Sequence, residues 1–274
     1  MKRIAYSIGI ASLLAIIIVS CQKSASTDPN ALTADERSLV ASAGFNSNWF
    51  ERTADGSYLI EGDILLTKAQ LQDMAGANPS NFLIVADEEH YRTYNLVTTG
   101  GYRNINVSLG SGFPAYYSTA LDNALARYNA LNLEIHFTRV ASGGEIHITG
   151  QNLGTSGGGC ILGMSAGFPS GGNPAPGFTM STSSCALSYL NTTDKVDEVM
   201  AHEIGHAIGF RHTDYKRRNS CGPGPGESAG SVGAVHIPGT PTNVSGSYNS
   251  WMMACVNGSP ILNGDDVIAL QYIY

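Results

Sequence analysis

Hydrophobic and polar residues follow one another in patterns that predict a mixed fold of helices and strands. Apolar residues at every second position predict strands over three stretches: 104–109, 133–140 and 145–149. Apolar residues at spacings of three and four predict helices over four stretches: 34–43, 68–75, 115–131 and 194–210. A closing helix is predicted over 263–274, because Asn263 and the acidic pair Asp265–Asp266 suit a helix N-terminus.

Less regular segments separate these elements. Residues 57–66 have the composition of a strand and precede the second helix. Two stretches rich in Gly, Ser and Pro, 150–190 and 219–247, are too long to be plain connections. We expect them to be functional or disulfide-tied loops.

The composition excludes some classes of function. Of the 274 residues, 43% are hydrophobic and 14% charged, with a formal net charge of -7. A nucleic-acid binder that relies on a basic face is excluded, because phosphate binding needs clustered positive charge. High apolar content with little charge per residue also argues against disorder.

The N-terminus is typical of an export signal. Lys2 and Arg3 precede an apolar run from Ile4 to Val19 that is too short for a confident membrane span. The residues that end in Cys21 resemble a bacterial lipoprotein signal, in which this cysteine is lipidated; the alternative is an ordinary signal peptide. We therefore expect a signal peptide over 1–20 and a membrane-anchored protein in the periplasm or at the cell surface.

Four cysteines follow Cys21, an even number that implies two disulfides in an exported protein, with three possible connectivities. The pairs Cys160–Cys185 and Cys221–Cys255 are favoured, because each closes one long Gly-rich loop. A four-cysteine zinc site is the alternative, but the C-x-x-C spacing typical of such sites does not occur.

The densest chemical pattern is His-Glu-Ile-Gly-His at 202–206, followed by His212. On a helix, His202 and His206 present two imidazoles to one ion, and Glu203 can reach water beside it. Gly209 permits a positive φ, so the chain can turn and bring His212 round as a third ligand. Three histidines and one open position are typical of a catalytic zinc site.

This motif resembles that of the metzincin zinc peptidases, and its core is similar to the bacterial dual-action HEIGH metallopeptidase family. The resemblance implies an α+β fold with a twisted mixed sheet, a long backing helix, an active-site helix and a C-terminal helix. It also implies an edge strand of the sheet within 177–187 and a Met-turn at Met252, with Met253 as the one-residue alternative. Asp214 is either an outer partner of a ligand histidine or, more simply, a local cap.

The function implied is that of an exported zinc endopeptidase acting on proteins or peptides, with one zinc ion and Glu203 as general base. Accessory calcium has no supporting motif, and we expect a monomer. The alternatives are a zinc-containing surface adhesion protein, or a peptidase limited to self-processing.

Residues 60–64, Ile-Glu-Gly-Asp-Ile, resemble the pro-segment motif of astacin-type metzincins, in which an aspartate blocks the zinc. The resemblance makes Asp63 a candidate latency ligand; a hairpin turn at Gly62-Asp63 is the alternative. We accordingly expect a tether and pro-segment over 21–95 and a peptidase domain over 96–274.

Overall fold

A computed structural model describes residues 32–76, 90–156, 158–222, 225–242, 249–256 and 262–274, which lie in one compact unit. The predicted signal peptide, Cys21 and the start of the predicted tether lie outside the described residues. Within the described ranges, no helix is long and apolar enough to cross a membrane.

Six α-helices and one short 3-10 helix lie in the described parts of the chain. The helices are α1 (Ala34–Ser42), α2 (Lys68–Gly76), α3 (Ala115–Asn129), α4 (Ser184–Tyr189), α5 (Thr193–Ala207), η1 (Asn219–Cys221) and α6 (Gly264–Ile273). The five helices predicted from the sequence are all present, each within three residues of its expected ends. Asn263 caps α6 and Thr33 caps α1, both through a reciprocal capping box.

Eight of the twelve strands in the described residues form one mixed sheet. The strands are β1 (Phe50–Arg52), β2 (Tyr58–Ile60), β3 (Ile64–Leu66), β4 (Tyr91–Arg92), β5 (Arg103–Leu109), β6 (Ile135–Val140), β7 (Ile146–Gln151), β8 (Thr155–Ser156), β9 (Gly159–Cys160), β10 (Gly163–Ser165), β11 (Gly177–Ser181) and β12 (Val235–His236). The sheet order is β1-β2-β3-β10-β11-β7-β5-β6.

Two strand predictions are wrong in detail. The segment 57–66 is a hairpin of β2 and β3, because the chain turns at Glu61 and Gly62, both with positive φ. The expected edge strand within 177–187 is β11, an interior strand with β7 on one side and β10 on the other. The strand next to it, β10, shows no alternation of apolar and polar residues in the sequence, because all three residues of its Gly-Met-Ser sequence are buried.

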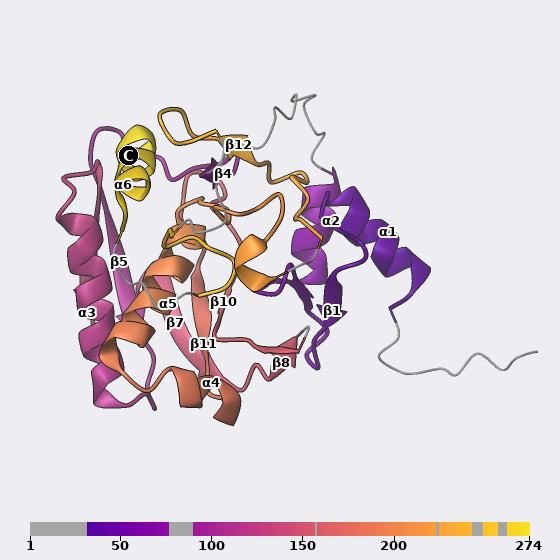
Figure 1. Ribbon diagram of the computed structural model, residues 1–274, viewed down its shortest axis with the longest axis horizontal. Helices are drawn as coiled ribbons and strands as arrows, with labels where there is room; N and C mark the ends of the chain where they lie inside the picture. Colours follow the sequence, from indigo (N-terminus) through magenta and orange to yellow (C-terminus); the bar gives the residue numbers. More distant parts are fainter. Residues whose placement is uncertain (1–31, 77–89, 157, 223–224, 243–248, 257–261) are drawn as a thin grey trace, which may run out of the picture. The chain divides into compact units, whose positions relative to one another are not determined.

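The predicted α+β architecture is confirmed. Helix α3 packs on β6 and on α5, and α5 in turn lies against β10 and β11 (Figure 1). Every residue of α5 from Val196 to Ala207 is buried, so the two histidines of this helix face protein rather than bulk solvent.

The N-terminal elements have a core of their own. Helices α1 and α2 lie on the side of the molecule away from α3 (Figure 1). Their apolar residues form a cluster with β1–β3, to which Phe168 also belongs. Strand β3 pairs in parallel with β10 at Ile64 and Ser165, so strands from both sides of the predicted boundary at residue 95 share one sheet. That boundary stays a prediction.

Candidate metal centre

Helix α5 and the turn after it supply three histidines. Thr192 caps the helix N-terminus by accepting from the Lys195 amide, and His202 and His206 lie one turn apart, with ring centroids separated by 4.7 Å. The helix ends before Gly209, whose φ of +109° and close approach to Leu96 exclude a side chain. The chain then turns so that His212 Nε2 lies 3.2 Å from His206 Nε2.

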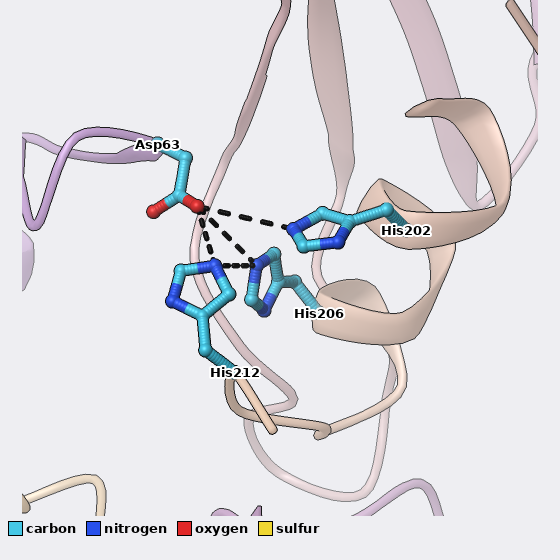
Figure 2. Close-up of side chains that lie close together, drawn as sticks. All are labelled: Asp63, His202, His206 and His212. Atoms are coloured by element: carbon cyan, nitrogen blue, oxygen red, sulfur yellow. Dashed lines mark hydrogen bonds and ion pairs between the residues drawn. The ribbon is translucent and has the colours of Figure 1, made fainter. Parts of the chain in front are cut away.

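Asp63 completes a buried group of four. Its carboxylate enters from the β2–β3 hairpin, opposite α5, and points at all three imidazoles (Figure 2). Asp63 Oδ2 lies 2.5 Å from Nε2 of His212, 3.8 Å from that of His206 and 3.9 Å from that of His202. One ligand atom from each residue lies within 4.8 Å of the others. The structure therefore brings together the three predicted histidines and the candidate latency ligand.

In His202 and His206, a hydrogen bond from the outer nitrogen, Nδ1, shows which ring nitrogen carries the proton. His202 Nδ1 donates to the carbonyl oxygen of Trp251 at 2.9 Å, and His206 Nδ1 donates to that of Phe210 at 2.8 Å. Burial lowers the pKa of His206 to about 4, so its ring is neutral near pH 7 and its Nε2 carries a lone pair.

This arrangement fits a metal ion. The lone pair of His206 Nε2 faces a carboxylate oxygen of Asp63, and a cation between the two acceptors removes the repulsion. The carboxylates of Asp63 and Glu227 outweigh the effect of burial and raise the pKa of His212 to about 10. Three imidazoles and a carboxylate are a donor set that suits a divalent transition metal.

Glu203 lies beside this group and is 2% exposed. Its Oε2 has no hydrogen-bond partner among the described residues. Burial raises the pKa of Glu203 well above the usual glutamate value, and the charge of Asp63 raises it further. A Cβ on Gly163 of β10 would lie 2.3 Å from Glu203 Oε1, so only glycine leaves room for this carboxylate.

The Met-turn candidate lies under the same helix. The structure places Met252, rather than Met253, against α5: a Cβ on Gly205 would lie 2.3 Å from the Met252 sulfur. The Met252 carbonyl accepts from the Thr213 amide at 2.7 Å, which joins the turn to the residue after the third histidine. Met253 instead lines a neighbouring cavity.

That cavity, with a volume of about 530 Å³, opens beside Glu203. Its walls include His202, Asp63 and the side chains of Val199 and Leu162. A largely apolar hollow next to a buried carboxylate and three convergent imidazoles is the usual form of a substrate site.

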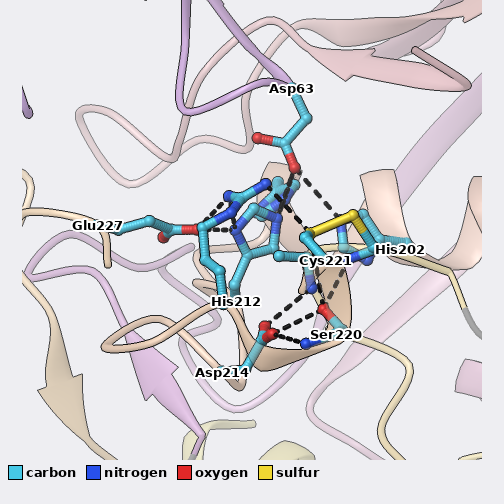
Figure 3. Close-up of a disulfide and its surroundings, with 11 residues drawn as sticks. Asp63, His202, His212, Asp214, Ser220, Cys221 and Glu227 are labelled. Atoms are coloured by element: carbon cyan, nitrogen blue, oxygen red, sulfur yellow. Dashed lines mark hydrogen bonds and ion pairs between the residues drawn. A yellow bond between two sulfur atoms is a disulfide. The ribbon is translucent and has the colours of Figure 1, made fainter. Parts of the chain in front are cut away.

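Both favoured disulfides are present. Cys160 pairs with Cys185 and Cys221 with Cys255, with Cα–Cα distances of 5.9 and 5.1 Å. Figure 3 shows the second disulfide beside the histidines. Cys21, the proposed lipid site, lies outside the described residues.

Asp214 is a local cap rather than a partner of a ligand histidine. Its Oδ2 accepts from the amide and hydroxyl of Ser220 at 2.9 and 2.6 Å, and its Oδ1 accepts from the Ala254 amide at 2.9 Å (Figure 3). It thereby joins the segment after His212 to the segment after the Met-turn.

The carboxylate on the outer nitrogen of His212, Nδ1, is one that the sequence does not predict. Glu227 Oε1 accepts from His212 Nδ1 and, at 2.5 Å, from Arg218. Arg218 and the fully buried Arg211 also pair with acidic groups here. The sequence does contain one signal for this residue: Glu227 is the single acidic residue in the Gly/Pro/Ser-rich stretch 219–247.

Comparison with known proteins identifies the family. Residues 58–274 match the model of the family described as "Dual-action HEIGH metallo-peptidase". No match was found among curated proteins. The solved structure of myroilysin matches with 19% identity over 45% of this chain and 57% of that chain, at a TM-score of 0.30. The chain thus spans less than two thirds of myroilysin's length.

The range that matches the family contains the hairpin with Asp63, all three histidines and the Met-turn candidate, and it covers well over half of the chain. The chain therefore belongs to the dual-action HEIGH metallopeptidase family.

Proposed function

We propose that this protein is an exported zinc endopeptidase of metzincin type in which His202, His206 and His212 hold the ion. The observation that carries the proposal is the convergence of three buried imidazoles beside a cavity and the buried carboxylate of Glu203. When bound, zinc lowers the pKa of water and polarises the scissile carbonyl.

Glu203 is the proposed general base. Its raised pKa suits it to accept a proton from the attacking water and to give that proton to the leaving amine. Its buried Oε2 has no hydrogen-bond partner among the described residues, and Gly163, which has no side chain, leaves room for its Oε1.

An extended substrate is proposed to bind along β10. This strand has β11 on one side, while its other side is joined to β3 at a single residue pair, Ser165 with Ile64. Displacement of β3 leaves backbone groups of β10 next to Glu203 available for pairing with a peptide strand. Recognition of the substrate through backbone hydrogen bonds suits an enzyme that cleaves within a polypeptide chain.

We further propose that Asp63 keeps the full chain latent. Its buried carboxylate lies against the histidines, where it occupies the position that a substrate carbonyl or water needs. The resemblance of residues 60–64 to an inhibitory pro-segment and this geometry support the same role.

Export and lipidation at Cys21 complete the proposal. Two disulfides favour an oxidising compartment, and the first 20 residues have the pattern of a lipoprotein signal. The mass of the mature N-terminus from expressing bacteria tests this, because a Cys21→Ser variant should lose the diacylglyceryl addition and leave the membrane fraction.

Mass spectrometry of zinc-loaded wild type and Glu203→Gln tests the peptidase. Each protein is incubated alone and with a denatured protein substrate, before and after limited proteolysis of its N-terminal segment. Cleavage by processed wild type and not by Glu203→Gln is expected. Cleavage of its own chain alone would indicate self-processing, and cleavage of nothing would contradict both forms of the enzyme proposal.

A further inference from the structure

We propose that Glu61 is a positioning residue for His212, acting through Arg211 and the loop of residues 225–233, here called the Glu227 loop. The inference rests on the proposed metal site, but it assigns to the N-terminal segment a supporting role in addition to the blocking role of Asp63. Glu61 and Asp63, two residues apart, would then have opposite effects on the metal centre: Glu61 would support the ligand His212, and Asp63 would block the site.

Glu61 has an uncommon conformation for its residue type. It is fully buried and has a φ of +55°, in the left-handed region that residues with a Cβ rarely adopt. Such strain persists where surrounding contacts determine the conformation, and it is frequent at functional sites. The carboxylate contacts of Glu61 are among those that hold it in place.

These contacts hold the Glu227 loop. Glu61 Oε2 accepts from Arg211 Nη2 at 2.8 Å, and its Oε1 accepts from the Ser228 amide at 3.1 Å. Arg211, itself fully buried, donates to the carbonyl oxygens of Ser228 and Gly233, both at 3.1 Å. Glu61 and Arg211 therefore fix both ends of the segment 228–233.

The same loop carries the carboxylate that orients the third histidine. Glu227 Oε1 accepts from His212 Nδ1, while its Oε2 lies 3.2 Å from Arg211 Nη2. A carboxylate on the outer nitrogen of a ligating histidine fixes the tautomer and the ring orientation, and its loss typically lowers metal affinity by about 10- to 100-fold. Glu61 thus reaches His212 through Arg211 and Glu227.

This cluster pairs buried acidic side chains with buried arginines. Two buried carboxylates, Glu61 and Glu227, face two buried arginines, Arg211 and Arg218. A Glu61→Gln variant keeps the shape and the acceptor for Ser228 but leaves Arg211 with one anionic partner. An under-compensated buried arginine competes more strongly for Glu227 and draws that carboxylate away from His212.

The test measures zinc affinity of the full chain by competition with a chelator, in an Asp63→Ala background so that the blocking carboxylate plays no part. Adding Glu61→Gln should lower the affinity about tenfold, within the range for outer partners of a metal ligand. Glu227→Gln should lower it at least as much. The two changes together should lower it no further than Glu227→Gln alone, because both act through one path.

Glu36→Gln is the matched control. Glu36 is also a paired carboxylate of the N-terminal segment, bound to Arg52 and to the Tyr58 hydroxyl, but its partners lie outside the Glu227 loop. It should leave zinc affinity unchanged. If Glu61→Gln does not fold, Glu61→Asp, which keeps the charge and shortens the reach, should give an intermediate loss.

Unchanged zinc affinity in the folded Glu61 variant would overturn the inference, as would a loss fully additive with that of Glu227→Gln. Absence of zinc binding in the Asp63→Ala protein itself would instead remove the proposed metal site, and this inference with it. Hydrogen exchange gives a second measurement: Glu61→Gln should speed exchange at residues 225–233 and leave α5 protected.

Discussion

The sulfur of Met252 lies directly against Gly205, the glycine between the two histidines of α5. A Cβ at position 205 would lie 2.3 Å from this sulfur, closer than normal packing permits, and 3.2 Å from Trp251 Nε1, a tight contact. The glycine of the His-Glu-Ile-Gly-His motif is thereby explained by packing, because it lets the Met-turn approach the helix that carries the ligands.

Gly205→Ala should therefore destabilise the protein, although alanine favours a helix interior over glycine. Overpacking of this kind costs about 1–3 kcal/mol, which exceeds the gain of about 1 kcal/mol in helix propensity. Thermal unfolding checks this. Gly264→Ala is the control, since Gly264 begins α6 and no atom lies within 4 Å of the position that its Cβ would take; it should be neutral or stabilising.

Gly163→Ala should impair catalysis while metal binding persists. The new methyl group would lie 2.3 Å from Glu203 Oε1 and displace the carboxylate from its present position. Since general-base catalysis contributes about 10²–10⁴-fold, we expect kcat to fall at least about tenfold. Peptide hydrolysis and zinc affinity are measured in the Asp63→Ala background.

Gly159→Ala provides the comparison for that variant. Gly159 also lines the cavity, but its Cβ would make only an ordinary contact, 3.7 Å from the Ser156 carbonyl oxygen. Its kcat should fall much less than that of Gly163→Ala. A parallel loss of zinc affinity in Gly163→Ala would contradict a specific effect on Glu203.

The disulfides should contribute similarly to stability but differently to the metal centre. With sequence separations of 34 and 25, chain entropy predicts about 4 and 3.5 kcal/mol for Cys221–Cys255 and Cys160–Cys185. Only the first joins the segment after His212 to the segment after the Met-turn, where Ser220 donates to Asp214.

Replacing both members of each pair by serine separates these effects. Denaturant unfolding should show comparable losses of stability for the two double variants. Zinc affinity should fall for Cys221→Ser/Cys255→Ser and stay near the parent value for Cys160→Ser/Cys185→Ser. Equal zinc affinities would show that the first disulfide does not hold the site.

The sequence predicts well what depends on local spacing. The helix with His202 and His206, the turn at Gly209 and the capped α6 follow from residues within a few positions of one another. The fold class follows from these elements and from the family resemblance, because alternation and helical periodicity are local properties of the backbone.

What the sequence does not predict depends on long-range contacts. Glu227 lies 15 residues after His212 in a stretch without periodicity, and Glu61 meets Arg211 across 150 residues. Strand β10 is buried on both faces, so its three residues carry no alternating pattern. Nearness in sequence makes Asp214 a candidate outer partner of His212, yet its carboxylate turns towards Ser220.

Asp63→Ala should activate the unprocessed chain. The aspartate is tethered beside the histidines, and an intramolecular ligand competes at an effective concentration of about millimolar or higher, so its removal should raise peptidase activity at least about tenfold.

Asp55→Ala is the control. Asp55 is an exposed residue in the β1–β2 connection of the same segment, and its hydrogen bonds among the described residues are local, to Thr53 and Ser57. Initial rates on a denatured protein substrate, measured before any processing, compare the three proteins. Equal rates for wild type and Asp63→Ala would show that the Asp63 carboxylate gives way freely to substrate and does not enforce latency.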